Sequence, residues 1–412
     1  MLAPPPPPAV KSPLGEREFV LLMALLMALQ ALAIDAMLPA LGTLSGELGV
    51  TDPNHRQLVV GIFLLASGIA SLFPGMLADR FGRRPVLLCC LGAYVVTTTA
   101  CALVTSFPAL LALRAALGVA SSGLVVLPSA IIRDRFSGDR MARMQSMVAM
   151  VFMVVPMIAP AMGQAVLLVA SWRWIFGVMG LLALMVAIWA WLRLPETLHP
   201  EYRQSLAPAK VIRAMGTIVT TRSAIGYVLG LALIQAAMFG YINSSQQLLG
   251  EHFGTGANFP IYFGAMALIM SCTSFINSRI VVRFGTRRVS HIALFFYIAA
   301  SLIQIVLAFS GHETLWAFVP VMTLNMCLMG FIGSNFGSMA LQPFAANAGS
   351  AASAQAFIRM VTASVLGALI GQAYDGTARP LAIALTIAGT TTLGLVLFTE
   401  RGRLFGRNAA EE

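Results

Sequence analysis

The acidic residues of this chain limit the chemistry that it can perform. Nearly all of its sixteen Asp and Glu residues lie in tails, in loops or at the ends of apolar runs, and only Asp35 lies well within one. A carboxylate inside a membrane span costs about 2.5–3.5 kcal/mol on insertion scales. Burial disfavours its charged form, so we expect Asp35 to bind and release a proton beside an aqueous cavity. A neutral aspartic acid that bonds a neighbouring helix is the structural alternative.

Pro39 lies four residues after Asp35. Proline has no N–H group, and its ring clashes with the carbonyl four residues earlier. The spacing therefore predicts that the helix bends at Asp35 and leaves a backbone acceptor free there. An incidental kink, which membrane helices tolerate, is the alternative.

Arg114 lies inside a later apolar run, on a face of small residues formed by Gly118, Ser121 and Ser122. Such a face allows another helix to approach closely. A guanidinium group stays charged and needs an acceptor inside a membrane. Asp35 has a similar expected depth and is one candidate partner, but coupling through water is equally open. A structural clamp is the alternative role.

Arg359 lies near the expected midplane of another apolar run, and no acidic residue in the second half of the chain shares that depth. We expect it to bond backbone carbonyls, Gln355 or Asn325, or to line a cavity. Contact with a substrate or anion and a purely structural role both stay open.

The composition of the chain indicates that most of it lies in lipid. The 412 residues are 58% hydrophobic and 10% charged, with a mean hydropathy of +0.84, whereas soluble domains contain roughly 25% charged residues. These values argue against a soluble enzyme, a nucleic-acid-binding domain and a disordered protein. The net charge of +10 does not change this, because the basic residues lie in short gaps between apolar runs.

Twelve apolar runs have the length of about 20 residues that a bilayer-crossing helix needs. They cover residues 19–41, 57–77, 86–106, 107–132, 145–170, 174–194, 224–249, 259–278, 290–310, 315–340, 351–374 and 380–399. A polar, basic segment with three prolines divides them into two sets of six. The expected parts are a Pro-rich tail (1–18), a six-helix bundle (19–194), a linker (195–223), a second six-helix bundle (224–399) and a tail (400–412).

The distribution of Lys and Arg predicts the orientation of the chain. With the N-terminus inside, the inner segments hold 21 of these residues, whereas the outer segments hold only Arg56, Arg173 and Arg379. Inner loops carry the excess of positive charge. We therefore expect both termini in the cytoplasm.

A short motif repeats at half the length of the chain. Arg80-Phe81-Gly82-Arg83-Arg84 is followed 203 residues later by Arg283-Phe284-Gly285-Thr286-Arg287. Two six-span halves related by such a repeat are a known transporter layout, with the substrate handled near the midplane between them. The expected fold class is an all-α membrane protein with two pseudo-symmetric six-helix bundles around a central cavity.

Several segments resemble a known family. Gly75-Met76-Leu77-Ala78-Asp79-Arg80-Phe81-Gly82-Arg83-Arg84-Pro85 resembles the signature loop between spans 2 and 3 of the major facilitator superfamily, and Leu113-Arg114 followed by Gly118 resembles the arginine motif of its twelve-span drug:proton antiporters. The segments 35–41, 159–163 and 194–198 together resemble its bicyclomycin and chloramphenicol resistance (Bcr/CflA) branch. The resemblance covers nearly the whole chain and implies the major facilitator fold.

The resemblance implies roles for the matching residues. Asp35 would carry the proton and interact with cations, and Arg114 would couple protonation to movement. Gating or conformational roles would belong to Gly75, Asp79, Arg80, Gly82, Arg83, Arg84, Asp134, Pro39, Pro160 and Gly163. We further assign substrate contact to Ala31, Ile34, Asp35, Leu38, Phe63, Gln235, Phe239, Asn243 and Arg359. The chain departs from the family pattern at Val282, which replaces the acid in the second copy of the loop, and at Ala159, which replaces a glycine.

The expected function is proton-driven antiport that exports small amphiphilic drugs of the phenicol or bicyclomycin type across the bacterial inner membrane. The alternatives are an exporter of a native metabolite, such as a sugar, nucleoside or amino-acid derivative, and an uptake symporter. We expect a monomer in the lipid bilayer that handles protons and a small molecule. The five cysteines lack metal-ligand spacing, and no nucleotide loop is present, so we expect no metal, no cofactor and no enzymatic activity.

Overall fold

A computed structural model describes residues 14–199, 201, 203, 208–311, 313–402 and 404–405. Within these residues the regular structure is entirely helical. The expected Pro-rich tail lies mostly outside the described residues, as does the last part of the C-terminal tail.

The described residues of the first half form nine α-helices and two short 3-10 turns. They are α1 (Glu16–Asp35), η1 (Leu38–Ala40), α2 (Leu41–Glu47), η2 (His55–Gln57), α3 (Leu58–Ala70), α4 (Leu72–Phe81), α5 (Arg83–Leu103), α6 (Phe107–Arg135), α7 (Gly138–Phe152), α8 (Val155–Val169) and α9 (Arg173–Arg193).

The second half begins with a helix inside the segment that the sequence suggests as a linker. Its described elements are α10 (Pro208–Thr220), α11 (Arg222–Ser245), the π-helical turn η4 (Gln246–His252), η5 (Gly256–Asn258), α12 (Phe259–Phe284), α13 (Thr286–Phe309), α14 (Leu315–Leu341), η6 (Gln342–Asn347), α15 (Ala348–Gln372) and α16 (Arg379–Thr399).

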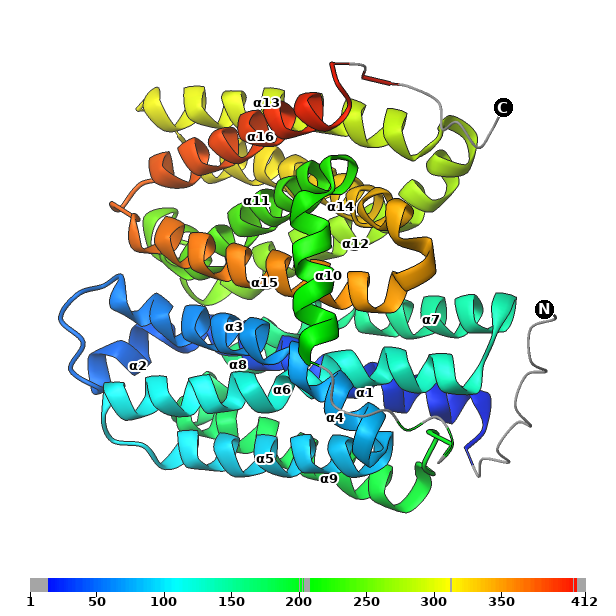
Figure 1. The fold of residues 1–412 in the computed structure, drawn as a ribbon. Helices are drawn as coiled ribbons and strands as arrows, with labels where there is room; N and C mark the ends of the chain where they lie inside the picture. Colours follow the sequence, from blue (N-terminus) through cyan, green and yellow to red (C-terminus); the bar gives the residue numbers. More distant parts are fainter. Residues whose placement is uncertain are drawn as a thin grey trace.

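Among the described residues, eleven helical segments are long and apolar enough to cross a membrane. A twelfth span is present if His55–Ala70 and Leu72–Phe81, which are bent by 43° at Ser71, are counted together. This agrees with the twelve runs that the sequence predicts. The helices of the two halves form two layers in Figure 1, and α10 lies across the view almost at right angles to them, packed on α15.

The two halves contact each other through α3 against α15 and through α8 against α12. Small residues bring these helices close together. A Cβ added at Gly68 on α3 would lie 3.2 Å from Met360 Cβ on α15, and one added at Gly264 on α12 would lie 3.1 Å from the Met157 carbonyl oxygen on α8. Close approach of backbones at small residues is a usual way for helices to associate in lipid.

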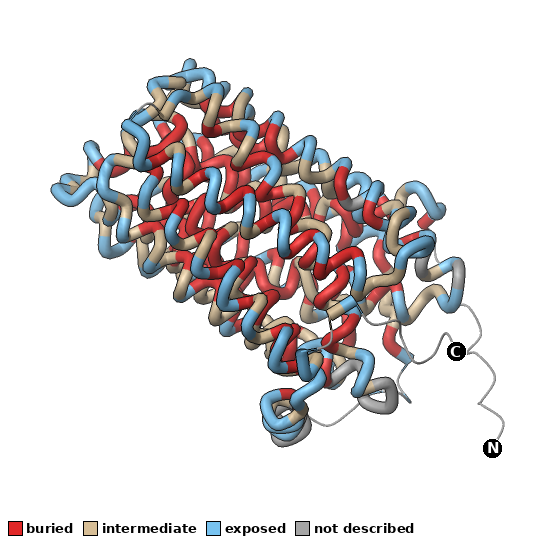
Figure 2. The backbone as a smooth tube through the Cα atoms, turned by 90° about the horizontal axis from the view of Figure 1, so that it is seen from above, coloured by how far each residue is buried: buried red, intermediate tan, exposed pale blue. Residues whose placement is uncertain are grey.

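Buried and exposed residues alternate along the helices in Figure 2. Many of the exposed residues are large and apolar; Val169 and Val282, for example, are each 87% exposed. Such an apolar exterior suits contact with acyl chains rather than with water.

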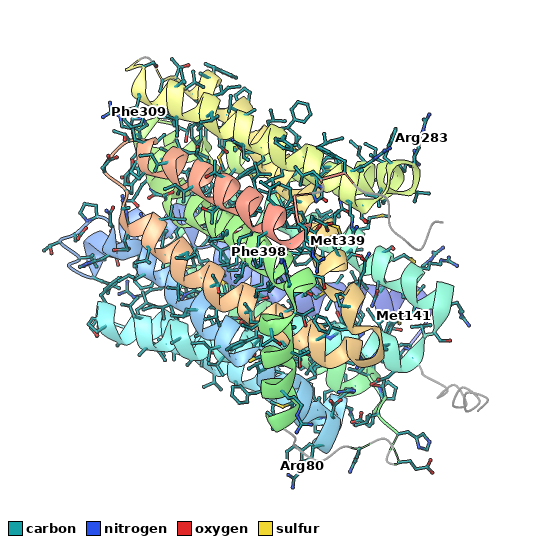
Figure 3. All side chains as sticks on the ribbon, turned by 45° about the horizontal axis from the view of Figure 1, so that its top comes forward. Arg80, Met141, Arg283, Phe309, Met339 and Phe398 are labelled. Carbon is teal, nitrogen blue, oxygen red and sulfur yellow. The ribbon has the colours of Figure 1, made fainter. Side chains whose placement is uncertain are left out.

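The repeated motif adopts the same backbone turn in both halves. Gly82 joins α4 to α5 with φ 105° and ψ 154°, and Gly285 joins α12 to α13 with φ 80° and ψ 151°. Glycine adopts such positive φ values without a steric cost. We call the end of the molecule that holds these two turns the Arg83 end, and the opposite end, where α3 begins, the Arg56 end. Figure 3 shows Arg283, in the last turn of α12, and Phe309, the last residue of α13, at opposite ends of the second half.

Candidate functional site

The first membrane span is interrupted directly after Asp35. The α-helix α1 ends at that residue, the Ala36 N–H group donates to the Leu32 carbonyl at 3.1 Å, and a 3-10 turn containing Pro39 follows before α2. The α-helical hydrogen bonding is therefore interrupted at the predicted place, because proline cannot continue the hydrogen-bond ladder, and Glu16–Glu47 still forms one candidate span.

Asp35 lies in a buried position at this interruption. Its exposed fraction is 7%, and no hydrogen bond or ion pair joins its carboxyl to another described residue. The carboxyl also sits at the C-terminal end of a helix, where the backbone carbonyls repel an anion. Burial without donors and this position both disfavour the charged form, so the carboxyl is suited to hold a proton and to release it only when its surroundings change.

Helix α8 packs onto the same interruption. A Cβ at Gly163 would overlap the Ala36 carbonyl oxygen and would lie 3.3 Å from Pro39 Cγ, so only glycine fits there without a shift. Pro160 lies inside α8 one turn earlier, and the span is broken between α7, which ends at Phe152, and α8. Gly163, one of the two residues of this span that were assigned to gating, therefore contacts the segment that holds Asp35.

Arg114 is fully buried on α6. Its Nε donates to the Val59 carbonyl at 2.8 Å, and its guanidinium carbon lies 4.5 Å from the centre of the Phe63 ring. A Cβ at Gly118 would overlap the Phe63 carbonyl oxygen, so glycine lets α3 and α6 approach closely enough for these contacts. Asp35 is not its direct partner, and Nη1 and Nη2 have no hydrogen-bond partner among the described residues.

Arg359 on α15 has a different partner from those expected. Its Nη1 donates to Gln235 Oε1 on α11 at 3.4 Å. Gln355 instead donates to the Gly337 carbonyl, and Asn325 accepts from Ser301 on α13. The expectation that Gln355 or Asn325 bonds Arg359 was wrong, because the Gln355 amide bonds helix α14 and the Asn325 amide bonds helix α13. Two predicted substrate residues, Gln235 and Arg359, are thus brought together.

The other predicted substrate residues are mostly engaged in helix packing. Leu38 and Phe63 have no exposed surface, and Phe63 lies under Arg114. On α11, Asn243 donates to the Gly367 carbonyl at 3.2 Å, and Phe239 packs against the same glycine. In α1, Ala31 is buried and Ile34 is half-buried, on the approach to Asp35.

The signature loop at the Arg83 end is held within the first half. The buried Arg83 lies 2.5 Å from Asp79 and 2.8 Å from Asp134, and Glu196 accepts hydrogen bonds from the N–H groups of Arg83 and Arg84 at 2.9 and 3.2 Å. The Arg84 side chain also donates to the Trp191 carbonyl at 2.6 Å. Asp134, to which the resemblance gives a gating role, is thus paired with Arg83.

Three further gating residues lie around this loop. A Cβ at Gly82 would overlap Glu196 Oε2, Arg80 lies exposed over the Phe81 ring, and a Cβ at Gly75 would only touch Val126 at 3.7 Å. Glycine is therefore required at residue 82 by both its conformation and its neighbour, whereas nothing in its surroundings requires it at residue 75.

A polar cluster at the Arg56 end was not predicted. Arg56 donates to both Glu251 oxygens, at 2.7 and 2.6 Å, and Gln57 donates to Gln247. The Asn54 side chain donates to the carbonyls of Gln372 and Tyr374 at 3.0 and 2.7 Å. The hydrogen bonds found between described residues of the two halves gather here. The sequence contained one signal for this cluster, which is that Arg56 is among the few arginines expected on the outer side.

Comparison with known proteins shows which protein family, which individual proteins and which solved structures this chain is similar to. The sequence model of the family described as Major Facilitator Superfamily matches residues 23–372 of this chain. The chain is 27% identical to a bicyclomycin resistance protein homolog of Haemophilus influenzae over 88% of its own length and 91% of that protein. It is 26% identical to the multidrug resistance protein MdtL of Klebsiella pneumoniae over 96% and 99% of the two chains. Its fold is similar to that of the human organic anion transporter MFSD10, with a TM-score of 0.69 and 17% identity over 94% of this chain and 100% of the other.

Proposed function

The chain belongs to the major facilitator superfamily of membrane transporters, and on this premise we propose that it is a proton-coupled antiporter that exports small amphiphilic drugs across the bacterial inner membrane. Two of the relatives to which it is similar are named for resistance to bicyclomycin and to multiple drugs. The proposed substrates are therefore compounds of the bicyclomycin or phenicol type.

The observation that carries the coupling proposal is the position of Asp35. Its carboxyl is buried, unpaired among the described residues and placed where α1 ends. In our proposal Asp35 loses its proton towards the cytoplasm when substrate enters, and protonation from the outer side displaces the substrate after the halves have moved. A site that changes its charge at each half-cycle needs such a carboxyl, because a permanently paired one would not exchange its proton.

Arg114 is proposed to sense the charge of Asp35 rather than to neutralise it in this conformation. Its Nε is held by Val59, which leaves the buried Nη1 and Nη2 donors free to bond a carboxylate or a bridging water. Buried donors without partners are costly, so a negative charge appearing nearby would be stabilised by them.

Alternating access is proposed to proceed by breaking the polar cluster at the Arg56 end. With the N-terminus in the cytoplasm, as the Lys and Arg distribution predicts, this end faces outward and the described conformation is closed on that side. The Arg56–Glu251 pair and its amide neighbours would separate when the outer side opens. Gly163 would transmit the movement of α8 to the Asp35 segment that it contacts.

The proposal is tested by drug resistance in cells that lack their own exporters. Expression of the wild-type chain is expected to raise resistance to bicyclomycin or a phenicol, and a protonophore is expected to remove that gain. Asp35→Asn is expected to abolish the gain at equal membrane abundance, whereas the matched variant Asp35→Glu, which keeps an ionisable group, is expected to retain part of it. Resistance in Asp35→Asn that remains sensitive to the protonophore would contradict the proposal.

A second candidate is export of a native metabolite, and the contact between Arg359 and Gln235 favours it. Arg359 is half-buried and has only the neutral Gln235 amide as its partner among the described residues, so it suits the carboxylate of an amino-acid derivative. Arg359→Gln would then remove export of the anionic metabolite while sparing neutral drugs. In vesicles with an imposed pH gradient, the direction of flux distinguishes either exporter from an uptake symporter.

A further inference from the structure

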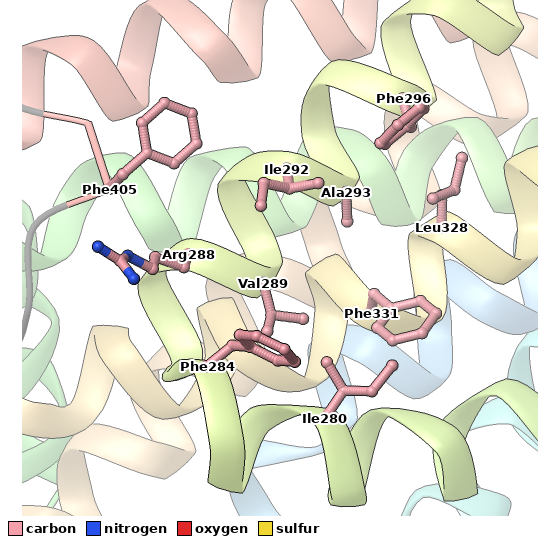
Figure 4. A pocket seen from close by; sticks show the side chains of 10 residues that line it. All are labelled: Ile280, Phe284, Arg288, Val289, Ile292, Ala293, Phe296, Leu328, Phe331 and Phe405. Carbon is pink, nitrogen blue, oxygen red and sulfur yellow. The ribbon is translucent and has the colours of Figure 1, made fainter.

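An apolar pocket of about 550 Å³ lies at the Arg83 end of the second half, away from Asp35. Ile280 and Phe284 of α12, Leu328 and Phe331 of α14, and Arg288 of α13 line it together with Phe405 of the C-terminal segment. Figure 4 shows the apolar side chains around the pocket, with Arg288 and Phe405 together at one edge. Its volume falls in the range of about 300–1,000 Å³ that is usual for small-molecule sites.

The wall that the C-terminal segment contributes is fixed in place. The Phe405 N–H group donates to His291 Nδ1 at 3.3 Å, and the Phe405 ring stacks on Phe295 with the ring centres 6.1 Å apart. His291 in turn contacts the Tyr227 hydroxyl, to which Glu400 is hydrogen-bonded. The segment after α16 is therefore anchored to α11 and α13, so the pocket is a feature of the fold.

The pocket opens on a surface that suits lipid. Phe284, Ile292 and Phe296 line it and are 52%, 47% and 62% exposed. They belong to α12 and α13, which are both candidate membrane spans. Arg288 lies in the first turn of α13, where long basic side chains reach the lipid headgroups. The pocket thus offers an apolar wall to an acyl chain and a cation at the level of a headgroup.

The arginines around this pocket lack acidic partners. Arg279, Arg283 and Arg288 form no ion pair with any described residue, and Arg279 and Arg283 directly precede the lining residues Ile280 and Phe284. Glu400 is the described acid at this end of the second half, and it lies 3.5 Å from Arg287.

The first copy of the loop differs in its charge balance. There Asp79 and Asp134 neutralise Arg83, whereas Val282 occupies the corresponding place in the second copy. The second copy therefore presents a net positive charge next to an apolar pocket, which suits an amphiphile with an anionic head.

We propose that this pocket is a binding site for an anionic phospholipid, with an acyl chain against Phe284, Leu328 and Phe331 and the phosphate on Arg288, supported by Arg279 and Arg283. Basic pockets between membrane helices recognise headgroups of this class. The site shares no residue with the Asp35 region, so its test does not depend on the transport cycle proposed above.

The proposal is tested by lipid binding to the full-length protein. Native mass spectrometry compares palmitoyl-oleoyl phosphatidylglycerol with the phosphatidylethanolamine of the same chains. Wild-type protein is expected to prefer the anionic lipid. Each arginine near a membrane surface contributes about 1 kcal/mol, so Arg288→Gln is expected to lower the affinity for phosphatidylglycerol about fivefold, and the triple variant with Arg279→Gln and Arg283→Gln more strongly.

Four further variants separate this site from general charge and from other occupants. Arg133→Gln removes an exposed arginine of α6 outside the pocket and is expected to leave the preference unchanged. Ala293→Leu fills the pocket without changing the charge and is expected to weaken binding of both lipids. Arg288→Lys, which keeps the charge, is expected to retain the preference. Truncation of the chain after Phe405 is expected to leave the preference for the anionic lipid unchanged.

Specific outcomes would overturn the proposal. Equal binding of the two lipids by the wild-type protein would exclude an anionic headgroup. Equal losses of affinity for phosphatidylglycerol in Arg288→Gln and Arg133→Gln would show that the preference depends on the overall charge of the protein and not on this pocket. Stronger lipid binding after truncation beyond Phe405 would show that the end of the chain itself occupies the pocket.

Discussion

The two ends of the molecule use their polar residues differently. At the Arg56 end, Arg56, Gln57 and Asn54 of the first half bond residues of the second half. At the Arg83 end, Asp79, Asp134 and Glu196 all bond the loop of their own half. The difference indicates that the Arg83 loop strengthens one half, whereas the Arg56 cluster holds the two halves together. In the alternating access that we propose, the Arg56 cluster separates during transport.

The largest effect should come from preventing this separation. In a background with the five native cysteines replaced, Gln57→Cys and Gln247→Cys place thiols on opposite halves within the Arg56 cluster. A reducible bifunctional reagent that joins them is expected to abolish transport, and reduction is expected to restore it. The control pair, Gln304→Cys and Glu313→Cys, lies within the second half and should tolerate the same treatment. Unimpaired transport by the linked Gln57–Gln247 pair would show that this end does not open.

The next effect concerns the stability of the first half. Arg83→Gln leaves Asp134 without its buried partner, and loss of one member of such a pair destabilises a protein by about 3 kcal/mol. We expect a fall of this size in the free energy of unfolding in detergent, with less protein in the membrane. The control Arg80→Gln removes an exposed charge and should change that free energy by about 0.5 kcal/mol or less. Similar losses in the free energy of unfolding for Arg83→Gln and Arg80→Gln would show that the ion pairs of Arg83 do not stabilise the first half, and the two ends would no longer differ in this way.

A smaller effect is expected from Glu251→Gln. The Glu251 side chain is half-exposed, so its pair with Arg56 contributes on the order of 1 kcal/mol to the closed conformation. Spin labels at Asp52→Cys and Asp375→Cys, which are both exposed at this end, report the separation of the halves. The open population should rise about fivefold. Glu313→Gln, whose parent residue bonds Gln304 within one half, should leave the distance distribution unchanged.

The smallest effect is a dependence of the protein's stability on pH that arises from one residue of the second half. Burial raises the pKa of Glu313, which lies in the loop between α13 and α14, although Gln304 and Arg379 partly oppose the rise. The folded state therefore holds a proton that the unfolded chain releases first, so stability should fall as the pH rises from the ordinary carboxyl range through the raised pKa. Thermal unfolding in detergent should show this slope, and Glu313→Gln should remove it. A slope of opposite sign would contradict the assignment.

Much of the fold follows from local patterns in the sequence. The apolar runs predict the twelve spans because membrane helices must be long and apolar. Pro39 predicts the interruption after Asp35, and the repeated Gly82 and Gly285 predict matching turns. These features depend on a few adjacent residues. The helix α10, in contrast, falls in a polar segment that the span criterion does not detect.

The contacts between the halves could not be predicted in the same way. Arg56 and Glu251 are 195 residues apart, and no local pattern relates them. The partner of Arg359 depends on how α11 and α15 pack. This packing brings Gln235, and not Gln355, within hydrogen-bond distance of the Arg359 guanidinium group. Phe63 suited a substrate cavity by type, yet the close approach of α3 and α6 at Gly118 places it under Arg114. Such choices depend on tertiary packing.

We propose that Asp35 exchanges its proton for substrate, and the release of protons from the purified protein measures this exchange. Drug added to wild-type protein in weakly buffered detergent solution should release protons, and Asp35→Asn should bind the drug without releasing any. Asp35→Glu should restore the release. If Asp35→Asn released as many protons per bound drug molecule as the wild type, another group would carry the proton, and the proposed role of Asp35 would be contradicted.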